Sequence, residues 1–161
     1  MKKNLAGFTL PELIVVLGIL MILLSLSTVN LLTIYGKTSL STKTSILISD
    51  IKQQQLKSML GDTEGETLAD SYGIYFEQNR YILFKGTSYS ASDPLNFALN
   101  LESDLQFSNI TFPQSQIVFS QGSGEVAGYT SDLDTVTLTN IRTSDSQTVE
   151  LNRYGVIIVV N

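Results

Sequence analysis

The sequence predicts an α+β fold, in which a long N-terminal hydrophobic helix continues into an amphipathic helix packed on a small antiparallel β-sheet domain. Three observations lead to this prediction. The 24 residues from Leu13 to Gly36 include no charged side chain. Residues 46–60 repeat apolar side chains at helical spacing, and from residue 72 onward strand-like runs alternate with turn-forming residues. A chain of 161 residues is long enough for one such domain.

The uncharged run has the length of a membrane-spanning helix. At about 1.5 Å per residue it extends roughly 36 Å, and the hydrocarbon core of a bilayer is about 30 Å thick. Lys2 and Lys3 precede the run and the next basic residue is Lys37, so the positive-inside bias places the N-terminus in the cytoplasm. We therefore expect a single-pass protein of the cytoplasmic membrane with its C-terminal domain outside. A cleaved secretory signal is disfavoured, because the run is long and no small-residue cleavage site follows it.

A second helical stretch is expected after the apolar run. Residues 36–45 are rich in Ser and Thr and form helices poorly, so they are either a loosened part of one long helix or a short break. Residues 46–60 present an apolar face that we expect to lie on the sheet, with Gly61 as the C-cap. The apolar residues of this stretch are Ile48, Ile51, Leu56, Met59 and Leu60.

Strands are expected from residue 72 to the end of the chain. Residues 72–77 and 80–84 flank Gln78-Asn79 and carry the signature of a hairpin. Residues 85–104 are loop-like, with an ambiguous run at 95–101. Further strands are expected at 116–120, 134–142, 147–154 and 156–160, with residues 143–146 as a turn.

The composition excludes several kinds of chemistry. The chain has no His, no Cys and no Trp, so it holds no disulfide, no His or Cys metal site and no His-dependent nucleophile. Its formal net charge of −5 argues against a general nucleic-acid binder, which presents a basic face. We expect no enzyme activity and no cofactor, because no catalytic motif is present.

One carboxylate, Glu12, stands at the start of the apolar run, where lipid makes a charge costly. Thr9 and Glu12 have the T-x-x-E spacing of a capping box, and Pro11 falls in the first turn, where its missing N–H does no harm. A local cap is therefore one interpretation of Glu12. A charged partner from outside the helix is the other.

The string AGFTLPEL at residues 6–13, after a short basic leader and before the apolar run, resembles the type III signal of type IV pilins and type II secretion pseudopilins. The resemblance implies that a prepilin peptidase cuts between Gly7 and Phe8 and that the new N-terminal Phe8 is N-methylated. It also implies that Glu12 pairs with the terminal amine of a neighbouring subunit during fibre assembly. Pro11 stands where the family more often has an aliphatic residue.

The C-terminal region is similar to one branch of that family, the GspH/FimT-type minor pilins and pseudopilins. The similar segments are 72–74, 81–86, 117–124 and 149–159. An Ala-Arg pair that is common in the first ectodomain helix of the branch is replaced near Gln54 and Gln55. The resemblance implies a pilin fold with a cleaved leader at 1–7, a transmembrane and fibre-core helix at 8–36, an ectodomain helix at 37–60 and a β-rich ectodomain at 61–161.

The function that this resemblance implies is structural. The chain would be a minor pilin or pseudopilin, processed by prepilin peptidase and assembled into a type IV pilus or a type II secretion pseudopilus. Its implied partners are other pilin or pseudopilin subunits, the prepilin peptidase, the inner-membrane assembly platform and, before assembly, membrane lipid.

Two alternative functions stay open. One is a DNA-binding minor pilin of a natural transformation apparatus, in which Arg142 and Arg153 form a small patch with Tyr154. The charge balance opposes it, because residues 36–161 hold 8 basic and 14 acidic residues. The other is a membrane-anchored binding domain that is never processed.

Two loops resemble ligand sites only in part. Asp132, Asp134 and Asp145 are acidic loop residues, but they lack the order of an EF-hand and we expect them to be solvated rather than to hold a metal. The glycine-rich residues 122–128 lack the Lys-Ser/Thr end of a P-loop, and we expect a flexible inter-strand loop there.

Overall fold

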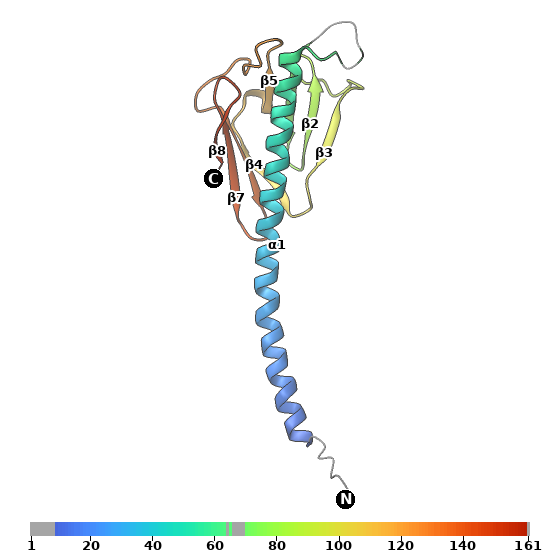
Figure 1. The fold of residues 1–161 in the computed structure, drawn as a ribbon, viewed down its shortest axis with the longest axis vertical. Coiled ribbons are helices and arrows are strands. Elements are labelled where there is room, and N and C mark those ends of the chain that lie inside the picture. The colour runs from blue at the N-terminus through green and yellow to red at the C-terminus, as the bar shows by residue number, and fades with distance from the viewer. Residues whose placement is uncertain (1–8, 64, 66–69, 161) are drawn as a thin grey trace, which may run out of the picture. The chain divides into compact units, whose positions relative to one another are not determined.

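The structure is a computed structural model that describes residues 9–63, 65 and 70–160, without the side chains of 26–36 and 159. One helix is followed by eight strands (Figure 1). The elements are α1 (Leu10–Leu60), β1 (Tyr72–Glu77), β2 (Arg80–Lys85), β3 (Phe97–Asn100), β4 (Leu105–Ile110), the 3₁₀ turn Pro113–Ser115, β5 (Gln116–Phe119), β6 (Thr135–Asn140), β7 (Ser146–Leu151) and β8 (Ile157–Val160). The chain forms two compact units, of which one ends at Tyr35 and the other begins at Gly36.

α1 continues through the Ser- and Thr-rich residues 36–45. These residues therefore do not form a break between two helices. The hydroxyl of Thr44 donates to the carbonyl of Leu40 at 2.9 Å, and that of Ser45 donates to the carbonyl of Ser41 at 2.9 Å. These hydroxyls are therefore satisfied by the preceding turn of the same helix and do not compete with its backbone hydrogen bonds.

The predicted C-cap at Gly61 is confirmed. Gly61 has φ of 65°, its N–H donates to Ser58 O at 3.4 Å, and the N–H of Asp62 donates to Lys57 O at 3.0 Å. This pair of bonds is the Schellman motif, which needs a residue that adopts positive φ at low cost. Gly61 thus ends α1 and turns the chain toward the strands.

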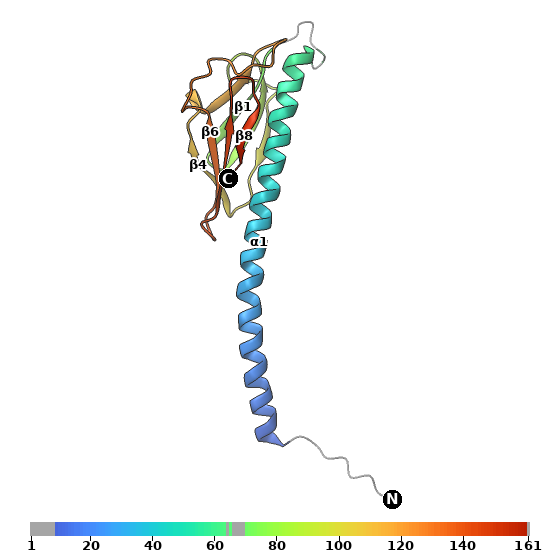
Figure 2. The same ribbon diagram turned by 60° about the vertical axis from the view of Figure 1, so that its left-hand side comes forward.

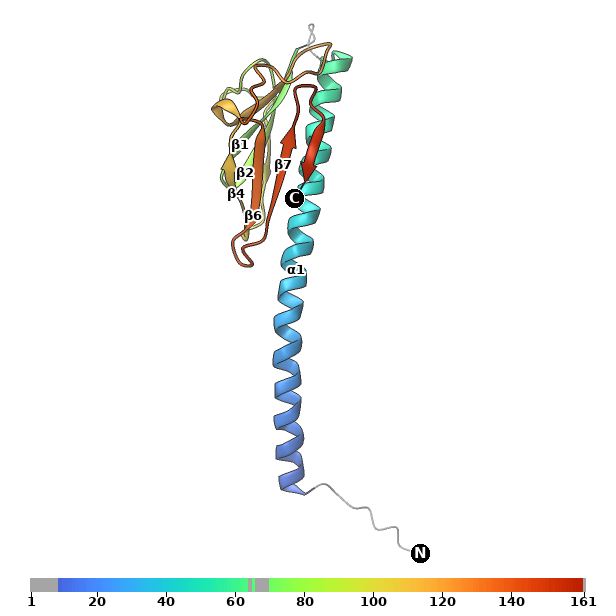
Figure 3. The ribbon, with the colours of Figure 1, turned by 90° about the vertical axis from the view of Figure 1, so that its left-hand side faces the viewer.

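The strands form two antiparallel four-stranded sheets rather than one small sheet. The first sheet has the order β3-β2-β1-β5 and the second has the order β4-β6-β7-β8. Figure 2 shows both sheets on the same side of the part of α1 that begins at Gly36, and Figure 3 shows β8 as the strand of the second sheet beside that helix. The predicted hairpin pairs Glu77 with Arg80 at its turn, as expected from Gln78-Asn79.

Two strands, β3 and β4, were not predicted as strands from the sequence. β3 falls inside the ambiguous run 95–101, at a free edge of the first sheet. β4 was not predicted, because its alternation of buried Leu105 and Phe107 is broken by a register shift between Phe107 and Asn109. A bulge of this kind removes the period-2 signal on which the prediction of a strand depends.

The face of α1 that packs on the sheets differs in part from the predicted one. Ile51 is fully buried and Ile48 is half-buried, as predicted, but Leu56, Met59 and Leu60 are 53%, 49% and 74% exposed. The expectation for these three residues was wrong. The buried stripe alternates steps of four and three residues and includes polar side chains: Leu40, Thr44, Leu47, Ile51, Gln54 and Ser58.

The polar residue Ser58 is buried in this stripe because its hydroxyl bonds to the backbone of two strands. Its hydroxyl donates to Phe119 O at 2.9 Å and accepts from the N–H of Tyr72 at 2.8 Å. Ser58 therefore joins the last turn of α1 to the start of β1 and the end of β5. Buried backbone groups at these strand ends would otherwise lack a partner.

Replacing Ser58 by alanine is expected to lower the free energy of unfolding by about 1–3 kcal/mol, because two buried backbone groups lose their hydrogen bonds. Chemical unfolding of the purified chain measures this change. Ser45→Ala is the matched control, since Ser45 is exposed and bonds only within its own helix. It should change the unfolding free energy by no more than about 0.5 kcal/mol. Equal effects of the two substitutions would contradict the anchoring role of Ser58.

Candidate functional site

The first turn of α1 holds the side chain of Glu12 in a defined position. One carboxylate oxygen, Oε2, accepts the backbone N–H of Thr9 at 2.9 Å and the hydroxyl of Thr9 at 2.8 Å. The carbonyl of Thr9 accepts the N–H of Leu13 at 3.1 Å, which makes Thr9 the N-cap and Glu12 residue N3. Glu12 thus makes the reach-back bond of a capping box, while the Thr9 hydroxyl bonds the carboxylate instead of the N3 amide.

This arrangement leaves Glu12 able to take a second partner. Both bonds from Thr9 end on Oε2, and within the described residues no hydrogen bond to Oε1 is found. The side chain is exposed and keeps its negative charge at the head of the helix. The local cap and the external partner, which the sequence left as alternatives, are therefore compatible. The predicted cleavage pair, Gly7 and Phe8, lies outside the described residues.

The helix that follows Glu12 presents apolar side chains on all sides. Every described side chain from Leu10 to Ser25 is exposed, including those on opposite faces of the helix, such as Ile14 at 60% and Val16 at 50%. A helix that is apolar around its whole circumference is stable when other apolar groups surround it. The exposed residues therefore form an apolar surface around this part of the helix.

Within the part of the chain that the structure describes, no helix is both long enough and apolar enough to cross a membrane.

The predicted span at 13–36 includes residues 26–36, whose side chains lie outside the described ones, and it stays a prediction.

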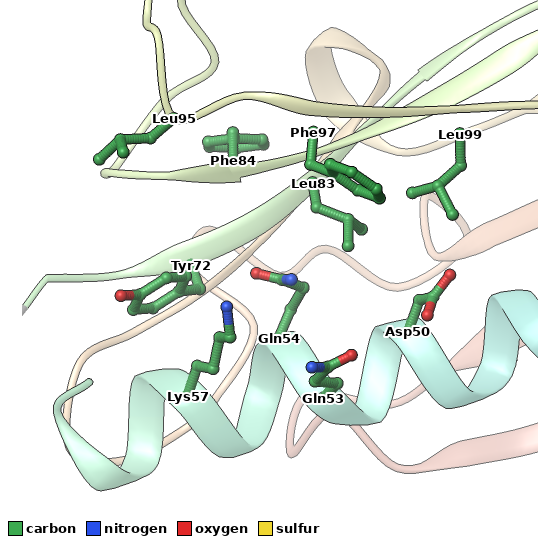
Figure 4. Close-up of a pocket in the computed structure, with 10 residues that line it drawn as sticks. All are labelled: Asp50, Gln53, Gln54, Lys57, Tyr72, Leu83, Phe84, Leu95, Phe97 and Leu99. Atoms are coloured by element: carbon green, nitrogen blue, oxygen red, sulfur yellow. The ribbon is translucent and has the colours of Figure 1, made fainter. Parts of the chain in front are cut away.

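A separate cavity of about 350 Å³ lies between α1 and the first sheet (Figure 4). Asp50, Gln54 and Lys57 point from the helix toward the strands, where Leu83 and Phe97 face them. The Tyr81 hydroxyl donates to the Asp50 carboxylate, and burial together with this bond raises the pKa of Tyr81. The carboxylate is therefore held in a structural bond. The full lining is Asp50, Gln53, Gln54, Lys57, Tyr72, Leu83, Phe84, Leu95, Phe97 and Leu99.

Gln54 and Gln55 of α1 contact different parts of the domain that begins at Gly36. Gln54 is 2% exposed and lines the cavity beneath the first sheet, and its Oε1 has no hydrogen-bond partner among the described residues. Gln55 donates from Nε2 to Gly124 O at 3.0 Å and to Tyr154 O at 2.7 Å. The sequence did not reveal the burial of Gln54 or the anchoring bonds of Gln55, because polar residues on a helix are usually solvated.

The glycine-rich loop is fixed to α1, so the expectation of a flexible loop was wrong. The N–H of Gly122 donates to Ser58 O at 2.9 Å, and Gly124 O accepts from Gln55. Gly124 has φ of 67°, and a Cβ there would overlap the side chain of Met59. Glycine is needed at this position for both its conformation and the close approach of the helix.

The structure does not bring Arg142 and Arg153 into one patch. Arg142 follows β6 in the turn to β7, and Arg153 lies in the turn from β7 to β8. Because the three strands are consecutive and antiparallel, these turns lie at opposite ends of β7 (Figure 3). Arg153 is also paired with Glu125, with Nη2 to Oε2 at 3.3 Å, and exposed Tyr154 stands beside it.

Among the acidic loop residues, Asp145 is separated from Asp132 and Asp134 by the length of β6. Asp134 precedes β6 and accepts the Tyr129 hydroxyl at 2.9 Å, whereas Asp145 lies beyond the other end of β6, 4.0 Å from the Lys37 ammonium. Among the described residues, no group of three or more His, Cys, Asp or Glu side chains is placed to hold a metal ion.

Comparison with known proteins found a match at the N-terminal end of the chain. A family model described as the prokaryotic N-terminal methylation motif matches residues 2–28, and this motif is the type IV pilin-like prepilin signal. The match supports a processed pilin-like structural subunit rather than an enzyme. The α+β architecture, with a helix packed on antiparallel sheets, is consistent with the pilin fold. No curated protein and no solved structure matched the chain.

Proposed function

We propose that this chain, which carries the type IV pilin-like prepilin signal at residues 2–28, is a minor pilin or pseudopilin of a type IV pilus or type II secretion pseudopilus. The observation that carries the proposal is Glu12, an exposed and preoriented carboxylate at the head of a helix whose described apolar side chains are exposed on all sides. A carboxylate in that place needs a cationic partner once its surroundings become apolar.

Processing would create that partner. Cleavage between Gly7 and Phe8 makes a new terminal amine at Phe8, and N-methylation leaves this amine cationic. Glu12 Oε1 of one subunit would accept the amine of the next subunit while Oε2 stays bonded to Thr9. The pair fixes how far one helix is displaced along its neighbour, because only one position satisfies both charges.

The apolar helix would serve two environments in turn. Before assembly its side chains contact lipid, and in the fibre they contact equivalent helices of other subunits. Since both environments are apolar, moving between them changes the hydration of these side chains little. The assembly platform of the inner membrane would carry out this transfer, with the ectodomain on the outer surface of the fibre.

The designation as a minor subunit rests on the GspH/FimT-like pattern of the C-terminal region.

Fractionation of sheared fibres tests this proposal. Cells that assemble type IV pili or a pseudopilus should release the chain with the fibres when the prepilin peptidase and the assembly ATPase are both active. Removing either activity should leave the chain in the membrane fraction. If the chain stays with the membranes in every strain, it is not a fibre subunit.

Removing the Thr9 hydroxyl tests the preorientation of Glu12. Thr9→Val keeps the backbone N–H bond to Glu12 but loses the hydroxyl bond, so incorporation into fibres should fall by about 5-fold, the equivalent of one hydrogen bond of about 1 kcal/mol. Ser25→Ala, which removes a hydroxyl that bonds only the carbonyl of Ile22, should assemble normally. The measurement is the ratio of fibre to membrane fractions, and a normal ratio for Thr9→Val would argue against a positioning role.

A further inference from the structure

Three loops of the ectodomain enclose a cavity of about 290 Å³, which we name the loop cavity. One loop follows β2, one contains the 3₁₀ turn before β5, and one connects β5 to β6. The cavity is separate from the prepilin signal and from the cavity in Figure 4, with which it shares no lining residue. The side chains that reach it include Thr87, Gln114, Gln116, Tyr129, Thr130 and Leu133.

The loop cavity is uncharged, although the domain around it is strongly acidic. No lining residue is Asp, Glu, Lys or Arg, whereas residues 36–161 hold 14 acidic and 8 basic side chains. Its side-chain polar groups are the amides of Gln114 and Gln116 and the hydroxyls of Thr87, Tyr129 and Thr130. Amides and hydroxyls can both donate and accept hydrogen bonds, so they suit a neutral partner that does the same.

The loop that carries Gln114 has an unusual backbone. Gln114 has φ of 55° and ψ of 23°, and the next residue, Ser115, has φ of 56°. Residues other than Gly, Asn and Asp rarely adopt this conformation, and such strained residues gather at binding sites.

A chain of hydrogen bonds orients the Gln114 side chain. Gln116 Oε1 accepts the N–H of Tyr89 at 2.9 Å, and Gln116 Nε2 donates to Gln114 Oε1 at 3.3 Å. This chain fixes the oxygen of the Gln114 amide toward Gln116, and the amide N–H₂ is then the group available to a ligand. Gln114 is exposed, so a ligand from solvent can reach it.

An apolar surface lies beside these polar groups. The ring of Tyr129 and the side chains of Leu133 and Val118 line the same cavity. The Tyr129 hydroxyl donates to the buried carboxylate of Asp134 at 2.9 Å, which holds the ring in place and raises the pKa of Tyr129. A fixed aromatic ring gives a flat surface for the C–H groups of a ligand.

We propose that the loop cavity binds a neutral saccharide ring. The hydroxyls of a sugar match the amides and hydroxyls of the lining, and the C–H face of the ring matches Tyr129 and Leu133. The volume of about 290 Å³ lies just below the range of roughly 300–1,000 Å³ for ligand sites, which favours one ring over a longer chain. The site would give the ectodomain a target of its own, whether or not the chain enters a fibre.

Saturation-transfer NMR on the full chain tests this site, with the protein in a detergent that has no sugar headgroup. The probes are methyl β-glucopyranoside and N-acetylglucosamine, compared with glucose 6-phosphate. We expect saturable binding of at least one neutral sugar, at least 10-fold tighter than that of the phosphate.

Gln114→Gly is the decisive variant, because glycine adopts φ of 55° without strain and the fold should be kept. It should weaken sugar binding at least 10-fold. Gln121→Gly, a matched change in an exposed loop residue outside the cavity, should bind normally. Thr130→Val gives a second test, since it removes a cavity hydroxyl at nearly constant volume, and it should also weaken binding.

Three results would overturn the proposal: no saturable binding of either neutral sugar, tighter binding of the sugar phosphate, or binding that neither Gln114→Gly nor Thr130→Val weakens. The experiment uses the chain with its leader in place. Its failure would therefore leave the proposed assembly function untouched.

Discussion

Glu12→Ala is expected to leave cleavage after Gly7 intact and to lower incorporation into fibres by roughly 100- to 4,000-fold. Without the carboxylate, the amine of the neighbouring Phe8 would enter the apolar fibre core unpaired. Removing one partner of a buried ion pair costs about 3–5 kcal/mol, and every 1.4 kcal/mol or so is a factor of ten. The measurement is the amount of processed chain in sheared fibres relative to the membrane fraction.

Glu12→Gln separates the two roles of this residue. Glutamine at position N3 can still accept the N–H of Thr9, so the cap of α1 is kept, but the charge is lost. If pairing with an amine drives assembly, the glutamine variant should assemble as poorly as the alanine variant. Wild-type incorporation of the glutamine variant would show that only the cap matters, and the pairing proposal would be wrong.

Leu47→Ala is expected to lower the free energy of unfolding of the domain that begins at Gly36 by about 2–5 kcal/mol. Leu47 is 1% exposed at the centre of the helix face that packs on the sheets, so its truncation leaves a cavity in the core. Thermal unfolding of the full chain in detergent measures the effect as a fall in Tm of about 10 °C.

Leu56→Ala is the matched control on the same helix. Leu56 is 53% exposed, and its replacement should change the unfolding free energy by no more than about 0.5 kcal/mol. A larger effect at Leu56 than at Leu47 would mean that the face predicted from the sequence, and not the face seen in the structure, is the buried one.

The parts of the fold that the sequence predicted well depend on local signals. The T-x-x-E cap, the end of α1 at Gly61 and the hairpin around Gln78-Asn79 each follow from a few adjacent residues. The prepilin signal is local too, since its residues are consecutive at 6–13. Such features need no knowledge of what lies elsewhere in the fold.

The parts that the sequence could not predict depend on distant contacts. In the sequence, Leu56 and Met59 resemble core residues. In the structure, Gln54 and Ser58 occupy the buried positions instead, because they pack against the strands or bond to them. The loop at 122–128 looks flexible until Gln55 and Ser58 are seen to hold it. Arg142 and Arg153 are close in sequence, but β7 separates them in space.

Of the two sites, the sequence predicted the one at Glu12 and did not predict the loop cavity. Glu12 was identified from the cost of its burial and from the family resemblance, and the structure adds that Thr9 bonds to only one of its two oxygens. The loop cavity gave no signal in the sequence, because its lining residues come from three separate loops and none of them is charged.

The N-terminal mass of the chain after co-expression with a prepilin peptidase tests the central claim most directly. A processed pilin-like subunit should lose residues 1–7 and begin at Phe8, with the added mass of one methyl group when the peptidase also methylates. A catalytically inactive peptidase should leave the full mass. An intact leader in the presence of the active enzyme would contradict the account, and would favour a membrane-anchored domain that is never processed.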